Sequence, residues 1–168
     1  MRHIFFASAL TLILPALAFS AHGATPTAAS DTQSVSGVCK PQNTYVTKGG
    51  LKAAPSDQRT LFACDNVVVT FLDAKRQHIA LEFGLKGGKK DSKVIGFDGI
   101  MEPVDGGLAT AKIKQMYLVR GVMNPTDDGD CYLAFTGRAV TEAQCSGSMH
   151  KGKDRWEAVI SFKAAPGR

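Results

Sequence analysis

The sequence has few of the residues on which hydrolytic enzymes depend. It holds four histidines in 168 residues, and only His78 and His150 lie beyond the first two dozen positions. Neither is accompanied by the Gly-x-Ser-x-Gly turn that presents a serine nucleophile in α/β-hydrolases. We therefore interpret both histidines as exposed side chains without a catalytic role, and we predict no catalytic residues.

Motifs for phosphates and metals are also missing. The glycine- and lysine-rich residues 84–90 lack the spacing of a phosphate-binding loop and the Ser or Thr that ends it. No Cys-x-x-Cys pair exists, which argues against zinc. Asp127, Asp128 and Asp130 suggest calcium, but they lack the alternate spacing and the twelfth-position glutamate of an EF-hand loop. An ordinary turn is the simpler interpretation, and we expect no metal and no cofactor.

Paired carboxylates for glycoside cleavage are not singled out by the pattern. Glu82, Glu102, Glu142 and Asp127 could each belong to such a pair. Exported domains commonly carry carboxylates of this kind, and nothing in the sequence selects two of them. An enzyme is therefore the less economical interpretation.

The chain has no strong excess of charge. It carries 20 Lys and Arg against 15 Asp and Glu, a net charge of +5. The lysines cluster only at Lys86, Lys89, Lys90 and Lys93. No aromatic residue lies within that cluster, which argues against binding of nucleic acid. The mild positive charge fits either an acidic partner or a solvated surface.

Long hydrophobic runs are absent except at the start of the chain. A short basic start is followed by apolar residues 4–19 and by small-residue cleavage patterns, which together indicate a cleaved signal peptide over residues 1–23. A membrane anchor would need about 20 apolar residues, more than this run provides. We predict a periplasmic or secreted product of about 145 residues with no membrane span.

Export changes the interpretation of the cysteines, because disulfides persist in an oxidising compartment. The chain contains four cysteines, an even number that fits two bridges and allows three connectivities. Proximity in the sequence favours Cys39 with Cys64 and Cys131 with Cys145. A loop of 15 residues, as in the second pair, gives about 3 kcal/mol in the loop-entropy model.

Residues 131–145 combine this covalent link with a strand pattern. Cys131, Leu133 and Phe135 alternate with polar or small residues, as in a strand with one buried face. A fold-back at residues 137–139 would place Cys145 opposite Cys131, Ala143 opposite Leu133 and Thr141 opposite Phe135. A turn at residues 141–144 competes with this register, because glycine comes first rather than last in the three-residue loop.

Other segments also predict strands. Residues 67–72 are β-branched and aromatic, as in a strand buried on both faces, and Ile79, Leu81 and Phe83 alternate in the second arm of a hairpin. The dipeptide Asp98-Gly99 predicts a second hairpin within residues 94–101. Residues 109–122 favour a strand over a helix, and Trp156, Ala158, Ile160 and Phe162 alternate in a closing strand.

Together these segments predict an all-β fold: a single small antiparallel β-sandwich or β-barrel domain, stapled by disulfides. We assign residues 24–37 to a flexible leader because they are small, polar and without periodicity. The β domain then covers residues 38–164, and residues 165–168 form a tail.

A short segment resembles a known family. Residues 62–66, Phe-Ala-Cys-Asp-Asn, run into a β-branched strand and are similar to the opening strand of the periplasmic C-type lysozyme inhibitor domains, which are small antiparallel barrels. The resemblance covers about ten residues. That family's serine-glycine segment and Trp-x-Lys-Gly are matched here only by Ser146, Gly147 and Trp156, and Trp156 is followed by Glu157. No functional residue is carried over.

These observations favour a non-enzymatic exported domain that binds a macromolecular partner, either a protein or a polymer of the cell envelope, as an inhibitor, immunity or interaction protein. We expect its contact surface near residues 86–93 or 146–154. The aromatic side chains Tyr45, Tyr117, Tyr132 and Trp156 would form a glycan-stacking platform or a protein hot spot if they gathered at one end. The clean alternation around Trp156 favours a core position for that residue instead. An envelope hydrolase or a small-ligand carrier is the alternative, and a structural subunit with an exposed sheet edge is a third hypothesis.

Overall fold

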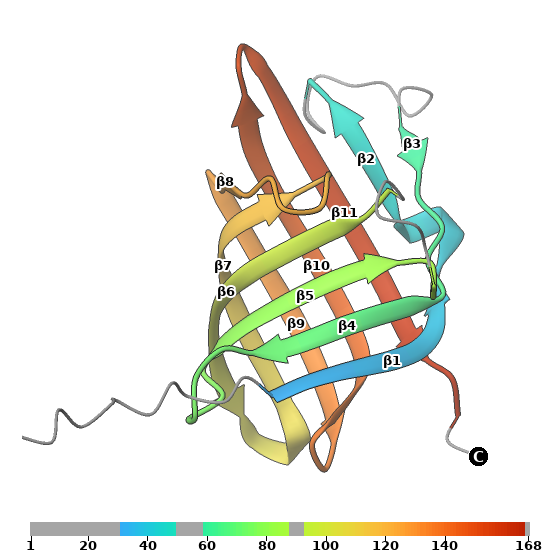
Figure 1. The fold of residues 1–168 in the computed structure, drawn as a ribbon, viewed down its shortest axis with the longest axis vertical. Helices are drawn as coiled ribbons and strands as arrows, with labels where there is room; N and C mark the ends of the chain where they lie inside the picture. Colours follow the sequence, from blue (N-terminus) through green and yellow to red (C-terminus); the bar gives the residue numbers. More distant parts are fainter. Residues whose placement is uncertain (1–30, 50–58, 88–92, 167–168) are drawn as a thin grey trace, which may run out of the picture.

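The computed structural model describes residues 31–49, 59–87 and 93–166. The predicted signal peptide and residues 24–30 of the predicted leader lie outside the described residues, as do Lys89 and Lys90. The described chain folds into one antiparallel sheet with 11 strands and two short 3₁₀ helices (Figure 1). The all-β fold class is therefore confirmed.

The elements follow one another along the chain as β1 (Asp31–Cys39), η1 (Pro41–Asn43), β2 (Tyr45–Lys48), β3 (Thr60–Leu61), β4 (Asn66–Phe71), β5 (His78–Gly84), β6 (Ile95–Val104), η3 (Asp105–Gly107), β7 (Leu108–Tyr117), β8 (Asn124–Pro125), β9 (Asp128–Thr136), β10 (Ala139–Lys151) and β11 (Asp154–Ala164).

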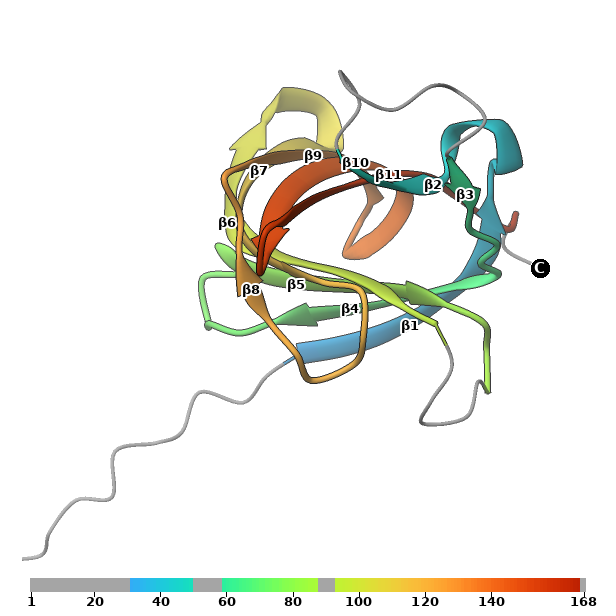
Figure 2. The ribbon, with the colours of Figure 1, turned by 90° about the horizontal axis from the view of Figure 1, so that it is seen from above.

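The sheet closes on itself into a barrel. Its order is β1-β4-β5-β6-β7-β9-β10-β11, and β11 pairs again with β1 through Gly37↔Ala164, Val38↔Lys163 and Cys39↔Phe162. Strands β2 and β3 continue the sheet from the other half of β11, and β8 pairs with β7. Seen from above, the strands enclose a common interior (Figure 2).

Hydrophobic side chains fill that interior. Phe83 on β5 lies 6.0 Å from Phe162 on β11 and 6.2 Å from Phe97 on β6, measured between ring centroids. All three rings are fully buried, as are Leu81 and Met116. The alternation that predicted strands thus places one face of each strand in a shared core.

The cysteine pairing favoured by proximity is confirmed. Cys39 is bonded to Cys64 and Cys131 to Cys145, and all four are buried. Cys145 lies opposite Cys131 in the register of β9 and β10, with Ala143 opposite Leu133, as predicted. Paired disulfides of this kind are consistent with an oxidising location outside the cytoplasm.

The turn of this hairpin is tighter than predicted. It consists of Gly137 and Arg138, with Ala139 opposite Thr136, and the alternative turn at residues 141–144 is wrong. Val140 rather than Thr141 lies opposite Phe135, because Thr141 is an extra residue in a β-bulge.

The hairpin predicted at Asp98-Gly99 is also wrong. Both residues lie inside the continuous strand β6, where the register with β7 shifts between them. A side chain at Gly99 would overlap the carbonyl oxygen of Lys112, so glycine serves here as a point of close approach rather than as a turn. The extra residue on β7 is Lys114, which reverses the inward parity from Ile113 to Met116.

The predicted leader was too long, because residues 31–37 belong to β1 and pair with β4 and β11. Residues 146–154, one of the two places where a contact surface was expected, form the tip of the β10–β11 hairpin. The strand predicted over residues 109–122 ends at Tyr117. Strand β4 buries Val67, Val69 and Phe71 completely but its other face only in part.

Arg76 covers one end of the barrel. Its guanidinium lies 3.5 Å from the centroid of the Phe71 ring and donates to Asp31 Oδ2 at 3.0 Å and to the carbonyl of Arg138. Burial lowers the pKa of Arg76. One side chain thus joins the start of β1 to the turns after β4 and β9.

Within residues 31–49, 59–87 and 93–166, no helix has the length and the apolar character needed to cross a bilayer.

Candidate functional site

A polar groove lies on the outer face of β9, β10 and β11, beside η1. It encloses about 320 Å³. Side chains or backbone of ten residues line it: Lys40, Asn43, Asp130, Tyr132, Gln144, Cys145, Ser146, Val159, Ile160 and Ser161. We call this site the Tyr132 groove.

Two rows of side chains form the floor of the Tyr132 groove. In the first, Tyr132 on β9 lies opposite Gln144 on β10, which lies opposite Ser161 on β11. In the second, Ser146 lies between Asp130 and Val159. These residues alternate with the inward-facing core residues of the same strands, so the packing of the core fixes their outward direction.

The two ends of the first row differ in exposure. Tyr132 is 65% exposed, which is unusual for a large aromatic side chain. Ser161 is 7% exposed, because η1 and its neighbours cover it. The groove therefore deepens from the exposed Tyr132 towards the largely covered residue Ser161.

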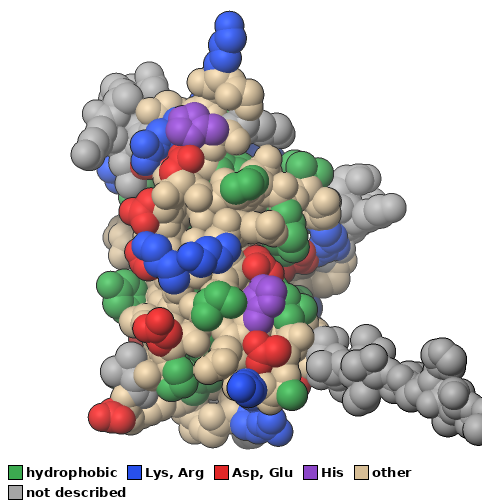
Figure 3. Space-filling view, turned by 90° about the vertical axis from the view of Figure 1, so that its left-hand side faces the viewer, with side chains coloured by type: hydrophobic (Ala, Val, Ile, Leu, Met, Phe, Trp, Pro, Cys, Tyr) green, Lys and Arg blue, Asp and Glu red, His purple; other side chains and the backbone are tan. Residues whose placement is uncertain are grey.

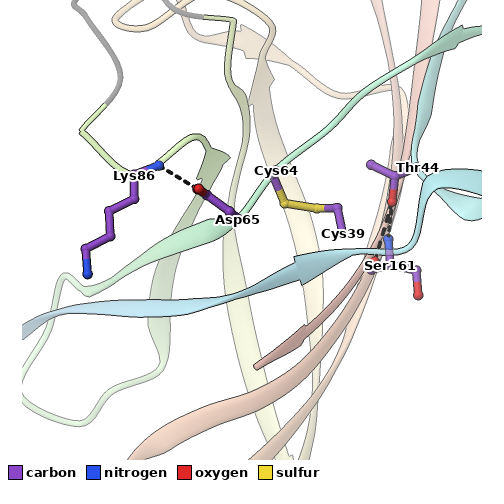
Figure 4. The surroundings of a disulfide bond; sticks show 6 residues. All are labelled: Cys39, Thr44, Cys64, Asp65, Lys86 and Ser161. Atoms are coloured by element: carbon purple, nitrogen blue, oxygen red, sulfur yellow. Dashed lines mark hydrogen bonds between the residues drawn. A yellow bond between two sulfur atoms is a disulfide. The ribbon is translucent and has the colours of Figure 1, made fainter. Parts of the chain in front are cut away.

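The wall of the groove is residues 40–44, and it is fixed firmly to β11. The Lys40 amide donates to the Ser161 carbonyl at 2.7 Å, and the Ser161 amide donates to Thr44 Oγ1 at 3.1 Å. The Thr44 hydroxyl donates in turn to the Ser161 carbonyl at 3.4 Å. Figure 4 shows the hydrogen bonds between Thr44 and Ser161 near the Cys39–Cys64 disulfide. Cys39 immediately precedes the wall in the sequence.

Apart from Asp130, the polar side chains of the Tyr132 groove are uncommitted within the described part of the chain. The side chains of Asn43, Gln144 and Ser146 form no hydrogen bond with any described residue, and neither does the Ser161 hydroxyl. Bonds to Ser161 involve only its backbone. The site thus presents donors and acceptors on a preformed surface.

Charges in and near the groove are largely compensated. Lys112 Nζ lies 3.0 Å from Asp128 Oδ1 and 3.3 Å from Asp130 Oδ1. Its hydrogen bond to Asp128 raises the pKa of Lys112, and the same bond lowers the pKa of Asp128. Lys40 adds one cation at the wall.

A second polar cluster lies on the outer face of β5, β6 and β7. His78 Nε2 lies 2.9 Å from Asp98 Oδ1, and Glu82 accepts from the Tyr117 hydroxyl at 2.9 Å and from Arg120 Nε at 3.0 Å. Burial, followed by the hydrogen bond to Glu82, raises the pKa of Tyr117 well above its usual range. Each of these polar side chains is hydrogen-bonded to another member of the cluster, so we interpret the cluster as structural.

The face formed by the ends of β6, β7 and β8 carries acidic and basic side chains interspersed, with hydrophobic side chains separated from one another (Figure 3). Such a surface is typical of a solvated face rather than of a contact patch.

The structure does not assemble the other predicted candidates. The four aromatic side chains do not gather into a platform: Trp156 packs against the core, as its alternation favoured, Tyr117 is buried over β6, and of the four only Tyr132 is highly exposed. Tyr45 stacks with Arg59.

The candidate carboxylates are also dispersed. Glu82 pairs with Arg120, Glu142 with Lys163 and Asp127 with His150. In the described residues, no group of three or more His, Cys, Asp or Glu side chains is placed to hold a metal. Of the basic cluster, Lys86 donates its amide to Asp65 at 2.6 Å (Figure 4).

Sequence reasoning did not identify the Tyr132 groove, although part of its signal was available. Once Cys131 is placed opposite Cys145, Gln144 necessarily lies opposite Tyr132. The wall at η1 could not be placed in this way, because it lies more than 80 residues earlier in the chain than β9. Strand β11 follows β10 directly in a hairpin, but residues 146–154 were not assigned to strands from the sequence.

Comparisons of the chain with models of protein families, with curated proteins and with solved structures gave no match.

Proposed function

We propose that this protein is an exported, non-enzymatic β domain, periplasmic or secreted, that binds a macromolecular partner in the cell envelope or outside the cell. Inhibitor, immunity and interaction proteins act in this way. The observation that carries the proposal is the Tyr132 groove, where an exposed aromatic side chain adjoins uncommitted hydrogen-bonding groups on a fixed surface.

The position of the groove favours a macromolecule over an enclosed small ligand. It opens on the outer face of the sheet, whereas large hydrophobic side chains occupy the interior of the barrel. Tyrosine is enriched among the residues that dominate binding energy at protein surfaces. A rigid wall reduces the entropy lost on binding, because little has to be ordered.

The lining favours binding over catalysis. The hydroxyls of Ser146 and Ser161 are potential nucleophiles, but none of the described residues that line the groove is a histidine that could act as their base. Asp130 is engaged by Lys112. The remaining polar side chains and the Tyr132 ring are suited to hydrogen bonding and stacking.

Site-specific photo-crosslinking tests the proposal. A photoreactive amino acid replaces Gln144 at the groove, and in a matched control it replaces the exposed Thr32 on β1. We expect irradiation of intact cells to give an adduct of defined mass from position 144 alone, and fractionation to recover it outside the cytoplasm. Equal labelling from both positions, or a product retained in the cytoplasm, would refute the proposal.

A further inference from the structure

We infer that the Tyr132 groove binds a neutral glycan chain. This inference rests on the function proposed above and specifies the chemistry of the partner. It is carried by three features of the groove: an exposed aromatic ring, a set of neutral donors and acceptors, and, at the deep end, a Ser161 hydroxyl that bonds to no described residue.

The ring of Tyr132 supplies an apolar surface at the open edge of the groove. Tyrosine combines an apolar body with a polar tip, which suits a ligand that is itself partly apolar and partly polar. The faces of a sugar ring carry C–H groups, while its edges carry hydroxyls. Stacking on Tyr132 would therefore bring sugar hydroxyls towards Gln144 and Ser161, its neighbours in the same row.

The hydrogen-bonding groups match hydroxyls in kind. The amides of Asn43 and Gln144 each donate and accept, and so do the hydroxyls of Ser146 and Ser161. A sugar hydroxyl also does both. Ligands that only accept or only donate would leave half of these groups unsatisfied.

Ser161 gives the strongest indication of a ligand. The residue is 7% exposed, and its hydroxyl makes no hydrogen bond with a described residue. Ser161 lines the groove, and its hydroxyl is not one of the enclosed, unpartnered polar atoms of the described chain, which are Thr47 Oγ1 and Trp156 Nε1. Because its backbone already holds the groove wall, the hydroxyl is free to serve a ligand.

Charge and hydrophobicity exclude other partners. An anionic polymer or a nucleic acid would need several free cations, but among the described lining residues Lys40 is the one Lys or Arg side chain. Protein hot spots gather several aromatic and Arg anchors, whereas Tyr132 is the one aromatic side chain of the described lining. A neutral, hydroxyl-rich chain is the partner that remains.

The shape fits an extended ligand. The row from Tyr132 to Ser161 crosses three strands, a span of about 10 Å at the usual strand spacing. The groove remains open towards solvent beside Tyr132. A sugar unit can thus enter the deep end while the chain continues over the aromatic edge.

Affinity electrophoresis of the mature protein tests the inference. The gels contain a neutral glucan (laminarin or hydroxyethyl cellulose), a neutral amino-sugar polymer (glycol chitin) or an anionic one (polygalacturonate), and titration calorimetry with the matching oligosaccharide gives Kd. We expect retardation by at least one neutral polymer that persists at about 0.5 M salt, where surface charge is screened. No retardation by any neutral polymer, or retardation that this salt abolishes, overturns the inference.

Three variants and one control locate the binding. Tyr132→Ala should weaken binding about tenfold or more, and Tyr132→Phe, which keeps the ring, should restore most of it. Ser161→Ala should weaken binding while its unfolding midpoint stays equal to or above that of the wild type. Ile100→Ala, which trims an exposed residue on β6, should bind normally. Normal binding by both Tyr132→Ala and Ser161→Ala would overturn the assignment.

The crosslinking experiment separates this inference from the proposed function. An adduct at position 144 whose mass falls on glycosidase treatment supports both. A protein adduct that is resistant to glycosidases overturns the glycan inference and leaves the proposed function standing. Absence of an adduct together with absence of retardation overturns both.

Discussion

At the scale of single residues, Asp73 shows how one carboxylate orders a turn. It accepts hydrogen bonds from the backbone amides of Gln77 and His78, which close the turn between β4 and β5. The amide of Gln77 contributes most to lowering the pKa of Asp73 below its ordinary value. Ionised Asp73 therefore holds the folded turn better than protonated Asp73 does.

This shift gives a pH prediction. Because the pKa is lower in the folded state, the stabilisation is complete above the unfolded pKa of about 4. It is lost as the pH falls through the folded value. We expect Asp73→Asn to be less stable than the wild type at neutral pH and to lose less stability on acidification, as measured by urea unfolding between about pH 6 and pH 2.5.

The matched control is Asp105→Asn, at an exposed turn where the carboxylate binds no described residue. It should follow the wild-type curve. Parallel acid curves for the wild type and Asp73→Asn would contradict the assigned role.

Gly96 illustrates a second residue-scale constraint, because the Tyr117 ring lies directly over it in the cross-strand register. A Cβ at position 96 would overlap the ring. We predict that Gly96→Ala lowers the free energy of unfolding by about 1–3 kcal/mol through overpacking. Denaturant unfolding measures the loss.

A double-mutant cycle tests that cause. In a Tyr117→Ala background the same substitution should cost far less, since nothing remains to be displaced. Gly84→Ala, at a strand end where the nearest atom is a methyl group of Val94 at 3.3 Å, serves as a second control. An equal cost in both backgrounds would show that the strand backbone, and not the ring, disfavours alanine.

At the scale of elements, local patterns predicted strands well and bulges poorly. Alternation identified β5 and β11, because one buried face repeats every two residues. Proximity in the sequence identified the pairing of Cys131 with Cys145. The extra residues Lys114 and Thr141 could not be predicted from the local sequence pattern, because the position of a bulge depends on the register with the partner strand. The Asp98-Gly99 dipeptide was mistaken for a turn for the same reason. Gly99 is required because the backbone of the neighbouring strand β7 passes close to it.

We expect the two disulfides to stabilise different parts of the barrel. They close loops of similar size, with sequence separations of 25 and 14, so removing either should cost about 3 kcal/mol. Only Cys39–Cys64 adjoins the wall of the Tyr132 groove. We predict that Cys39→Ala/Cys64→Ala accelerates hydrogen exchange at the Lys40 and Phe62 amides, whose acceptors are Ser161 and Thr44.

The variant Cys131→Ala/Cys145→Ala is the matched control. Exchange is measured by NMR under conditions in which both variants remain folded. The control should leave those two amides protected relative to the rest of the barrel, despite a similar loss of global stability. Equal acceleration in both variants would mean that the first disulfide stabilises the molecule as a whole without a particular effect on the wall.

At the scale of the whole molecule, the site and the closure are both non-local. The floor of the Tyr132 groove comes from the consecutive strands β9, β10 and β11, but its wall comes from residues near 40, which reach the floor only through the pairing of β1 and β2 with β11. Closure depends on β1, whose residues 31–36 are almost all polar and carry no strand periodicity. Their strand character comes from pairing with β4, whose inner face is strongly hydrophobic. This explains why the sequence predicted the barrel class but misassigned these residues to a leader.

That dependence gives the last prediction. A chain that begins at Asp31 retains the six pairs between β1 and β4, the packing of Val35 on the core and the contact of Asp31 with Arg76. A chain that begins at Val38 loses all three and keeps only the short pairing with β11. The unpaired β4 edge would then be open to association between molecules.

We expect the chain from Asp31 to unfold cooperatively as a monomer, and the chain from Val38 to lose near-ultraviolet circular dichroism and to aggregate. The loss should be comparable with the whole stability of a small domain, about 5–15 kcal/mol, because an open barrel exposes its core along an entire strand. Size-exclusion chromatography and thermal melting of both chains measure it. Melting temperatures within a few degrees of each other would mean that β11 alone closes the barrel, and that residues 31–36 add a strand without being required for the fold.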